Sequence, residues 1–288
     1  MADSPYTDLD RPPLHEAALR RALIVGDLWT DVRVVARTGS TNADVASAGR
    51  DGAPEGLVIV AEQQDAGRGR LGRTWVSPPR AGLAVSVLLR PAAPIARWGW
   101  LPLLAGVALA EAVGRVGVVD AVLKWPNDLL VRSATASDLV GPGYGKCAGL
   151  LAEMVPGGAV VLGIGLNVHQ RVDELPPPAE LGALPPVSLA LAGALCTDRD
   201  PLLRALLRSL ATWYSRWSAA DGDPVASGVR EAYLRGCVTL GADVRVSLPD
   251  GATVAGRASD VDLDGRLVVV DATGDRRAVA AGDVRHVR

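Results

Sequence analysis

The chain has 288 residues, of which 49% are hydrophobic and 22% are charged, with a formal net charge of −2 at pH 7. This apolar content supports a packed core and excludes an intrinsically disordered chain, and the nearly balanced charge provides no field that would gather nucleic acid or an anionic membrane. The three cysteines and three histidines are widely spaced, which predicts neither a disulfide framework nor a metal centre built from them.

The first fifty residues predict a leader followed by short elements. Residues 1–13 are acidic and proline-rich without an apolar stretch, so we expect no secretory signal and a cytoplasmic location. Apolar positions at helical spacing predict a helix over residues 15–25, and a β-branched run predicts a strand over residues 32–36. The polar residues 39–42 predict the capped start of a helix over residues 43–49.

The next segments predict a sheet with one buried helix. Strands are predicted at residues 57–61, 81–89, 118–124, 129–132, 147–154 and 159–167. Residues 101–116 predict a buried helix, and their longest apolar stretch, residues 101–113, is too short to cross about 30 Å of hydrocarbon. Residues 133–145 predict an exposed hairpin loop, and residues 175–186 predict a proline-rich loop.

In the last third of the chain, the predicted elements change from a long helix to short strands separated by turns. Residues 202–219 predict an amphipathic helix that carries aromatic side chains. From residue 236 onward, short strands alternate with three turns that contain Asp-Gly or Gly-Asp pairs, a pattern typical of a small all-β barrel. We therefore expect an α+β domain over residues 37–235, preceded by a leader and helix at residues 1–36 and followed by a β module at residues 236–288.

Lysine is rare in this chain. Of the 30 lysine and arginine residues, only Lys124 and Lys146 are lysines. Because lysine offers a compact point charge and arginine a planar fork, the two are not interchangeable at a reacting centre. We interpret both lysines as candidate functional residues, with a solvated surface lysine as the alternative.

The segment GRGRLGRTW, residues 67–75, is the strongest local motif. Its glycines allow close approach of the backbone to an anion, and its arginines supply charge-assisted hydrogen bonds to carboxylate or phosphate. It lacks the GxxxxGK[ST] pattern of a P-loop, and arginines fill the gaps of a dinucleotide-binding GxGxxG pattern. A solvated linker is the alternative, but a loop between two core strands favours a functional role.

Three further motifs stand at the ends of predicted elements. In KWPND, residues 124–128, Asp128 can hold a metal or take a proton and Asn127 can bind substrate, with a structural salt bridge as the alternative. The alternating glycines of GIGLN, residues 163–167, leave one sheet face bare, as a flat ligand or a tight strand crossing requires. Residues 40–42 suit a helix cap or the wall of a polar pocket.

Six segments follow one another along the chain: GSTN, AEQQ, GRGRLGRTW, KWPNDLL, KCAGLLAE and GIGLNV. Together they resemble the biotin protein ligase family, the biotin–acetyl-CoA-carboxylase ligases, strongly over residues 37–170 and weakly over the terminal β module. The resemblance implies a mixed β-sheet flanked by helices, followed by an SH3-like C-terminal domain. It also implies that biotin and ATP, with Mg²⁺, form biotinyl-5′-AMP and pyrophosphate before the biotinyl group passes to a carrier lysine.

The resemblance assigns residues to the biotin and nucleotide pockets. It places Ser40, Thr41 and Asn42 in the biotin pocket, Gln64 at the ureido end of biotin, and Asn167 near the adenylate. Further contacts are expected from the loop and from neighbouring strands: Gly67, Arg68, Gly69, Arg70, Arg73, Trp75, Asn127, Gly149 and Gly165.

The resemblance also assigns the reacting centre. It places Lys146 at the biotin carboxylate and the α-phosphate, with Lys124 and Asp128 beside them and Asp128 as the candidate magnesium ligand. The loop of residues 67–73 would close over the acyl-adenylate, with Arg68 and Arg70 as its main contacts. Cations are needed there because the reaction joins two anions. The implied partner is the biotin carboxyl carrier domain of acetyl-CoA, another acyl-CoA or pyruvate carboxylase.

Two departures from the family pattern bear on function. Bifunctional members carry an N-terminal winged-helix domain, whereas residues 1–36 show no helix-turn-helix pattern, so we expect a monofunctional ligase that binds neither a specific DNA site nor a membrane. Residues 133–145 also make a longer link than usual between KWPND and Lys146.

Two alternative functions remain. A lipoate-type acyl ligase would share the general fold, but Gln64 and the glycine–arginine loop favour a biotin ligase over a lipoate ligase. An RNA-binding protein with an RG loop would also fit that loop, but the balanced charge and the aromatic content of 4% speak against it.

Overall fold

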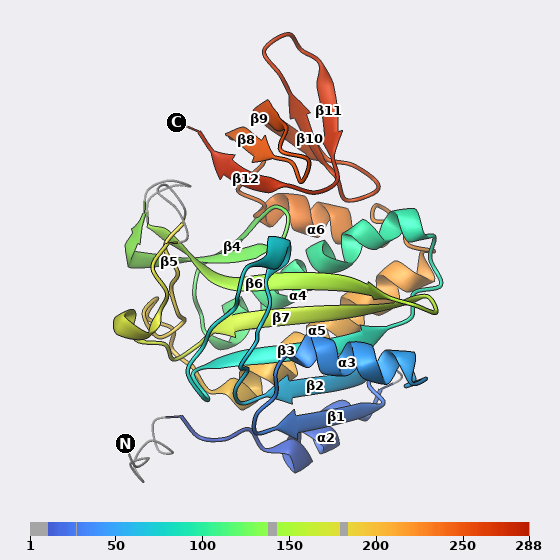
Figure 1. The fold of residues 1–288 in the computed structure, drawn as a ribbon, viewed down its shortest axis with the longest axis vertical. Coiled ribbons are helices and arrows are strands. Elements are labelled where there is room, and N and C mark those ends of the chain that lie inside the picture. Colours follow the sequence, from blue (N-terminus) through green and yellow to red (C-terminus); the bar gives the residue numbers. More distant parts are fainter. Residues whose placement is uncertain (1–10, 27, 138–142, 179–183, 288) are drawn as a thin grey trace.

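The computed structural model describes residues 11–26, 28–137, 143–178 and 184–287 (Figure 1). A seven-stranded sheet has the order β1-β2-β3-β7-β6-β5-β4. Its strands are β1 Asp31–Val35, β2 Leu57–Ala61, β3 Gly82–Leu89, β4 Ala121–Lys124, β5 Asp128–Ser137, β6 Tyr144–Val155 and β7 Ala159–Asn167. Strands β1 and β2 are parallel and all other neighbours are antiparallel, which confirms the expected mixed sheet.

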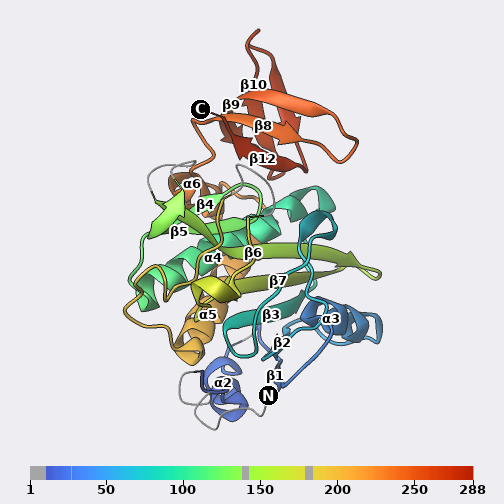
Figure 2. The same ribbon diagram turned by 60° about the vertical axis from the view of Figure 1, so that its left-hand side comes forward.

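Helices cover both faces of this sheet. They are α2 Glu16–Leu23, α3 Thr41–Arg50, α4 Trp100–Val116, α5 Arg199–Ala219 and α6 Val229–Gly236. Helices α4 and α5 pack together against one face, and α3 packs on the other face over β2, β3 and β7 (Figures 1 and 2). The two faces therefore have different neighbours. Because successive side chains of a strand point to opposite faces, alternate residues of one strand contact different helices.

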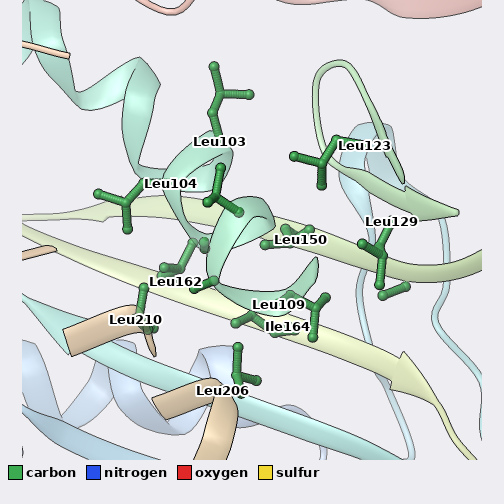
Figure 3. Close-up of a cluster of buried hydrophobic side chains, with 14 of the residues drawn as sticks. Leu103, Leu104, Leu109, Leu123, Leu129, Leu150, Leu162, Ile164, Leu206 and Leu210 are labelled. Carbon is green, nitrogen blue, oxygen red and sulfur yellow. The ribbon is translucent and has the colours of Figure 1, made fainter. Parts of the chain in front are cut away.

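Strand β7 shows this division. Leu162 and Ile164 pack with leucines of α4 and α5 in the main core (Figure 3), whereas Val161 packs in a smaller cluster with Val45 of α3. Burying each such side chain contributes about 1.5–3 kcal/mol. Gly163 lies two residues further along the α3 face, at the point where the packing with α3 ends and a cavity begins.

The second sheet is antiparallel and has the order β11-β10-β9-β8-β12, in agreement with the expected SH3-like module. Its strands are β8 Asp243–Ser247, β9 Thr253–Val261, β10 Leu267–Val270, β11 Arg276–Val279 and β12 Asp283–His286. We call residues 239–287 the C-terminal module and keep residues 37–235 and 236–288 as a proposed domain division.

The C-terminal module packs against the end of the first sheet near β4 and α6 (Figures 1 and 2). The indole N–H of Trp100 donates to Leu263 O at 3.0 Å, and that of Trp125 donates to Gly265 O at 3.1 Å. Gly265 has φ +80, and a Cβ there would lie 2.8 Å from the Gly99 carbonyl carbon. The close contact therefore requires glycine at this position.

Several predicted boundaries are wrong. The strand predicted at 118–124 begins at Ala121, because Val118 has φ +53 and cannot continue a pleated strand. The loop predicted at 133–145 is shorter, because β5 continues to Ser137 and β6 begins at Tyr144; residues 138–142 lie outside the described residues. Ser137 pairs with Tyr144 at the end of the two strands, and no alternating apolar pattern marks this extension in the sequence.

The buried helix is longer than its apolar core suggests. The short 3₁₀ segment η2, Ile95–Gly99, leads into α4, and together they form a helical segment that is long and apolar enough to span a membrane by length and composition. Of its most apolar stretch, 61% is buried inside the molecule. The core helix of a soluble protein passes the same test, so the segment carries no membrane assignment.

Candidate active site

A cavity of about 260 Å³ opens on the α3 face of the large sheet, between the start of α3, the glycine–arginine loop and β12. All of the predicted site residues line it except Gly67. Gly67 instead supports the base of the loop, where a Cβ would lie 2.4 Å from Trp75 O. Residues far apart in the sequence are thus brought to one place, but their individual roles depend on their contacts.

Neutral groups form a cluster at the start of α3, which we call the hydroxyl–amide cluster: Thr41, Asn42, Gln64 and Ser86. The N–H and hydroxyl of Thr41 donate to Gln64 Oε1 at 2.8 and 3.0 Å. Ser86 Oγ lies 2.7 Å from Thr41 Oγ1 and 2.6 Å from Asn42 Oδ1. These bonds fix a wall of hydroxyl and amide groups that suits an uncharged polar ligand.

The capping role expected for the polar residues 39–42 is wrong. Helix α3 begins at Thr41, two residues earlier than predicted, and Ser40 is its N-cap without a side-chain capping bond. The Gln64 side chain instead accepts from the first N–H of the helix. A residue distant in the sequence therefore satisfies a donor that a local cap would otherwise satisfy.

Charged groups form a second cluster across the cavity, which we call the charge cluster: Lys124, Asp128, Lys146, Arg70, Arg73 and Asp283. Lys146 Nζ lies 2.7 Å from Asp128 Oδ1. Burial raises the pKa of Asp128, but Lys146 and Lys124 outweigh burial, so the net pKa lies below its usual range. Asp128 is therefore held as a carboxylate.

The two lysines have different surroundings. Lys146 has a side chain that is 29% exposed, whereas Lys124 is buried at 8% exposure and donates to Val284 O at 2.7 Å. Burial lowers the pKa of Lys124, and Asp128 and Asp283 oppose that shift. Lys124 is thus engaged by the protein itself, while Lys146 is the more accessible cation.

The glycine–arginine loop lies over the charge cluster. Arg70 Nη1 donates to Asn127 Oδ1 at 3.3 Å, and Arg73 Nη2 donates to Asp283 Oδ2 at 2.5 Å. Burial lowers the pKa of Arg70, against the attraction of Asp128 and Asp283. Arg68, expected to be a main contact of the adenylate, lines the cavity but lies 3.7 Å from Glu153 Oε2, beside the hydroxyl–amide cluster.

The charge cluster holds more cations than anions: Lys124, Lys146, Arg70 and Arg73 face Asp128 and Asp283. The excess corresponds to two positive charges. Partly buried cations attract phosphate and carboxylate groups more strongly than exposed ones, because less water screens them. The cluster is therefore suited to hold two anionic groups next to each other.

The bare glycine face expected for a flat ligand is occupied by side chains of the protein. A Cβ at Gly165 would lie 2.5 Å from the Trp75 ring, one at Gly149 3.3 Å from the same ring, and one at Gly163 2.0 Å from Asn42 Oδ1. The glycines thus make room for Trp75 and Asn42, which themselves line the cavity. In this structure the flat group on the sheet is an indole.

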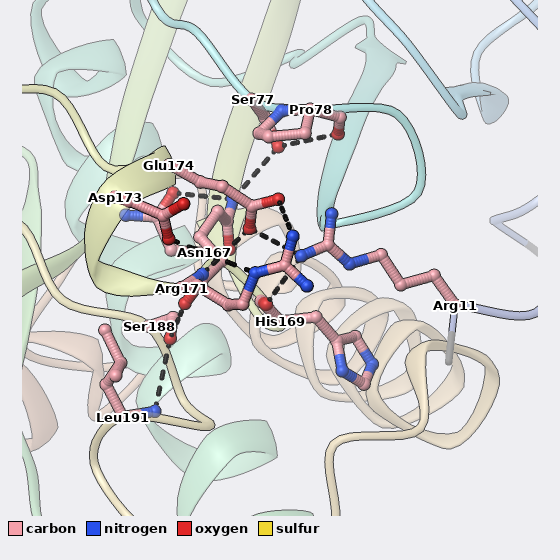
Figure 4. A network of polar contacts seen from close by, with 11 residues as sticks. Arg11, Ser77, Pro78, Asn167, His169, Arg171, Asp173, Glu174, Ser188 and Leu191 are labelled. Atoms are coloured by element: carbon pink, nitrogen blue, oxygen red, sulfur yellow. Dashed lines mark hydrogen bonds and ion pairs between the residues drawn. The ribbon is translucent and has the colours of Figure 1, made fainter. Parts of the chain in front are cut away.

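Asn167 lies at the margin of the cavity in a polar network (Figure 4). Its side-chain N–H donates to Val187 O at 3.1 Å, and its Oδ1 accepts from Gln170, which also donates to Ser77 Oγ at 2.9 Å. Asn167 is only 4% exposed, and its side-chain amide already makes hydrogen bonds to protein groups. It shapes this side of the cavity by holding the surrounding loops.

The site offers little to a metal ion on its own. Within the part of the chain that the structure describes, no group of three or more His, Cys, Asp or Glu residues is placed to hold one. Asp128, the expected magnesium ligand, is already paired with Lys146. Carboxylate oxygens suit Mg²⁺, but one paired carboxylate does not make a complete site.

Sequence reasoning missed several residues that line the cavity or support it, among them Ser86, Glu153, Asp283 and His286. Ser86 interrupts an apolar strand and is fully buried, a signal that was available. Glu153 accepts from Asn42 Nδ2 at 2.6 Å. Asp283 and His286 come from β12, and no local pattern marks them. Burial and the charge of Lys124 lower the pKa of His286 to about 4, and its Nε2 is buried without a hydrogen-bond partner.

Comparison with known proteins gives consistent matches. A Biotin/lipoate A/B protein ligase family model matches residues 34–169, and a Biotin protein ligase C terminal domain model matches residues 239–287. The biotin–[acetyl-CoA-carboxylase] ligase of Mycobacterium tuberculosis is 42% identical over 290 residues, which cover 98% of this chain and 100% of that protein. The bifunctional ligase/repressor BirA of Bacillus spizizenii is 30% identical, over 86% of this chain and 71% of that protein.

Among solved structures, the biotin protein ligase from Aquifex aeolicus in complex with biotin and ATP superposes with a TM-score of 0.71. The match has 22% sequence identity and covers 90% of this chain and 100% of that one, so it supports the fold alone. The full-length relative at 42% identity, together with matches in both parts of the chain, carries the assignment. The chain belongs to the biotin protein ligase family.

Proposed function

We propose that this chain activates biotin with ATP and transfers the biotinyl group to a lysine of the biotin carboxyl carrier domain of acetyl-CoA carboxylase. The observation that carries the proposal is the charge cluster with its excess of cations, placed across one cavity from a neutral hydroxyl–amide cluster. The relative at 42% identity is named for this ligase activity. The C-terminal match favours biotin over lipoate, because its model describes biotin protein ligases.

In the first step, a carboxylate oxygen of biotin attacks the α-phosphorus of ATP, and the bond to pyrophosphate breaks. Both reactants are anions, so their approach is opposed unless cations lie beside the forming bond. Lys146, partly exposed in the cavity, would contact the carboxylate and the α-phosphate, and Arg70 would offset charge from the loop side. The hydroxyl–amide cluster would hold the uncharged ring system of biotin.

In the second step, the carrier lysine amine attacks the acyl carbon of biotinyl-5′-AMP, AMP leaves, and the amine loses its proton. Asp128 has a lowered pKa and is paired with Lys146, so it is a weak proton acceptor. We propose that Asp128 positions Lys146 and orients the incoming amine through its negative charge. The proton would then leave with the AMP phosphate or to water.

Further parts of the proposal concern the setting of the reaction. Mg²⁺ would be carried mainly by the phosphates of ATP, since the described residues supply no dedicated metal cage. Acyl-CoA and pyruvate carboxylase carriers are further candidate partners, and the cytoplasm is the proposed location. We also propose that the chain binds no specific DNA site, because its formal net charge of −2 at pH 7 gives no excess of positive charge to attract the phosphate backbone.

The test is ATP–pyrophosphate exchange with purified protein, with biotin, with lipoate and without either acid. Exchange that depends on biotin is expected, followed by biotinylation of a carrier domain when one is added. Exchange driven by lipoate alone, or no exchange with either acid, would contradict the proposal. Specific binding of a promoter DNA fragment by the protein at physiological salt would contradict the proposal that the chain binds no specific DNA site.

A further inference from the structure

Lys124 is buried where the two sheets meet. It ends β4 of the large sheet, and its ammonium donates to Val284 O of β12 at 2.7 Å. A buried ammonium is costly unless anions lie near it. Asp128 and Asp283 supply that compensation from opposite sides of the junction.

Asp283, the residue before Val284, reaches the glycine–arginine loop. Arg73 donates to both of its carboxylate oxygens, at 2.5 and 3.5 Å, in a paired geometry that restricts the guanidinium. Arg73 is in turn bonded within the loop, since its carbonyl accepts from Gly69 N–H at 2.7 Å and its N–H donates to Arg70 O at 3.2 Å. A continuous set of contacts therefore joins β4, β12 and the loop.

The loop needs such support. Leu71 and Gly72 have φ +56 and +73, and Leu71 is 57% exposed. A glycine-rich segment with little buried apolar surface has low local stability, so anchoring contacts decide where it lies. Arg73 with Asp283 is an anchor of this kind, and it lies on the side of the C-terminal module.

We propose that Lys124 is a positioning residue that holds β12 against the end of β4, so that Asp283 fixes Arg73 and keeps the glycine–arginine loop over the cavity. The C-terminal module thereby acts as the outer support of the loop. This inference rests on the proposed function, because the loop would shield an acyl-adenylate from water. Lys124 acts on the loop through Val284 and Asp283, whereas Lys146 acts on the reactants.

The test compares Lys124→Met with wild-type protein by amide hydrogen exchange. Methionine keeps much of the volume of lysine and removes its charge. We expect exchange of loop residues 69–75 and of β12 to rise by about fivefold or more, as expected when an anchoring contact is lost. We also expect more biotinyl-5′-AMP to escape per carrier modified.

Arg97→Met is the matched control. Arg97 is a half-buried cation that also donates to a carbonyl of the C-terminal module, Leu263 O at 2.7 Å, but it does not line the cavity. Its loss should leave loop exchange and adenylate escape at wild-type values. Asp283→Asn is a second variant, which weakens only the contact between Asp283 and Arg73. It should raise the hydrogen exchange of the loop without raising that of β12.

Unchanged loop exchange in Lys124→Met, combined with lost adenylation, would overturn the proposal and place Lys124 among the groups that contact the reactants. If Lys124→Met fails to fold, Asp283→Asn decides: wild-type loop exchange there would also overturn it. Failure of the proposed function would look different, because wild-type protein would then show no biotin-dependent pyrophosphate exchange. Hydrogen exchange needs no ligase activity, so the two outcomes are separable.

Discussion

The two clusters of the cavity are built by opposite means. The hydroxyl–amide cluster consists of neutral groups that largely satisfy one another, as Thr41 does with Gln64, and Asn42 also donates to the Glu153 carboxylate. The charge cluster is unbalanced, with more cations than Asp128 and Asp283 can neutralise. The hydroxyl–amide cluster is therefore preformed by its own hydrogen bonds before a ligand binds. The excess positive charge of the charge cluster is neutralised only when anionic groups bind there. Substitutions should therefore affect binding in the first region and reaction rate in the second.

The largest effect is expected for Lys146→Arg in the charge cluster. The planar guanidinium keeps the charge but cannot replace a compact ammonium 2.7 Å from Asp128. Biotin-dependent pyrophosphate exchange should fall by about 100-fold or more, a typical loss for one charge-stabilising donor. The conservative change Lys124→Arg should cost less, since Lys124 bonds to the protein. Wild-type exchange in Lys146→Arg would contradict a role at the reacting anions.

Asp128→Asn should come next. The amide keeps the shape but removes the negative charge that offsets Lys146 and Lys124. Single-turnover transfer from biotinyl-5′-AMP to a carrier domain should slow by about 10–100-fold, with a smaller loss in adenylation. If adenylation falls and transfer does not, Asp128 belongs with the nucleotide and its proposed role toward the amine is wrong.

Ser86→Ala tests the hydroxyl–amide cluster. Loss of the hydroxyl removes contacts with Thr41 and Asn42 and should loosen the neutral wall by about 1 kcal/mol. The KM for biotin should rise by about fivefold to tenfold while kcat stays near wild type. Ser47→Ala, on the exposed side of α3, is the control and should change neither constant. If Ser86→Ala lowers kcat and leaves the KM for biotin unchanged, the assignment of binding to the hydroxyl–amide cluster and of reaction rate to the charge cluster is wrong.

The smallest effect concerns His286, whose folded pKa of about 4 lies below the ordinary value of 6.5. The unfolded chain binds the proton more readily, so this histidine favours folding above pH 6.5 and its contribution is lost as the pH falls toward 4. After allowance for partial exposure the loss is about 1–2 kcal/mol. Urea unfolding of His286→Gln at pH 7 and pH 4.5 should show a shallower pH dependence than wild type. An equal slope would mean that His286 is not buried in its neutral form.

Much of the fold could be predicted from residue patterns. The buried strand β2, the paired strands β6 and β7, and the turn-rich C-terminal module follow from hydrophobic periodicity and from Asp-Gly turns. Boundaries were less predictable where the chain lacks such a pattern. Helix α5 begins at Arg199, three residues before the predicted start, because Asp198 caps it and Pro201 fits in its first turn.

The sequence by itself determined which groups are present for chemistry: two lysines among many arginines, a glycine–arginine loop, and alternating glycines in β7. Only the tertiary structure decided how they are used. The register of β5 on β6 brings Asp128 to Lys146, and Trp75, not a ligand, lies against Gly165. Asp283 and His286 reach the cavity because the C-terminal module packs on β4, a contact between distant segments. Local patterns encode elements, whereas such contacts depend on how the elements pack, and no short stretch of sequence contains that information.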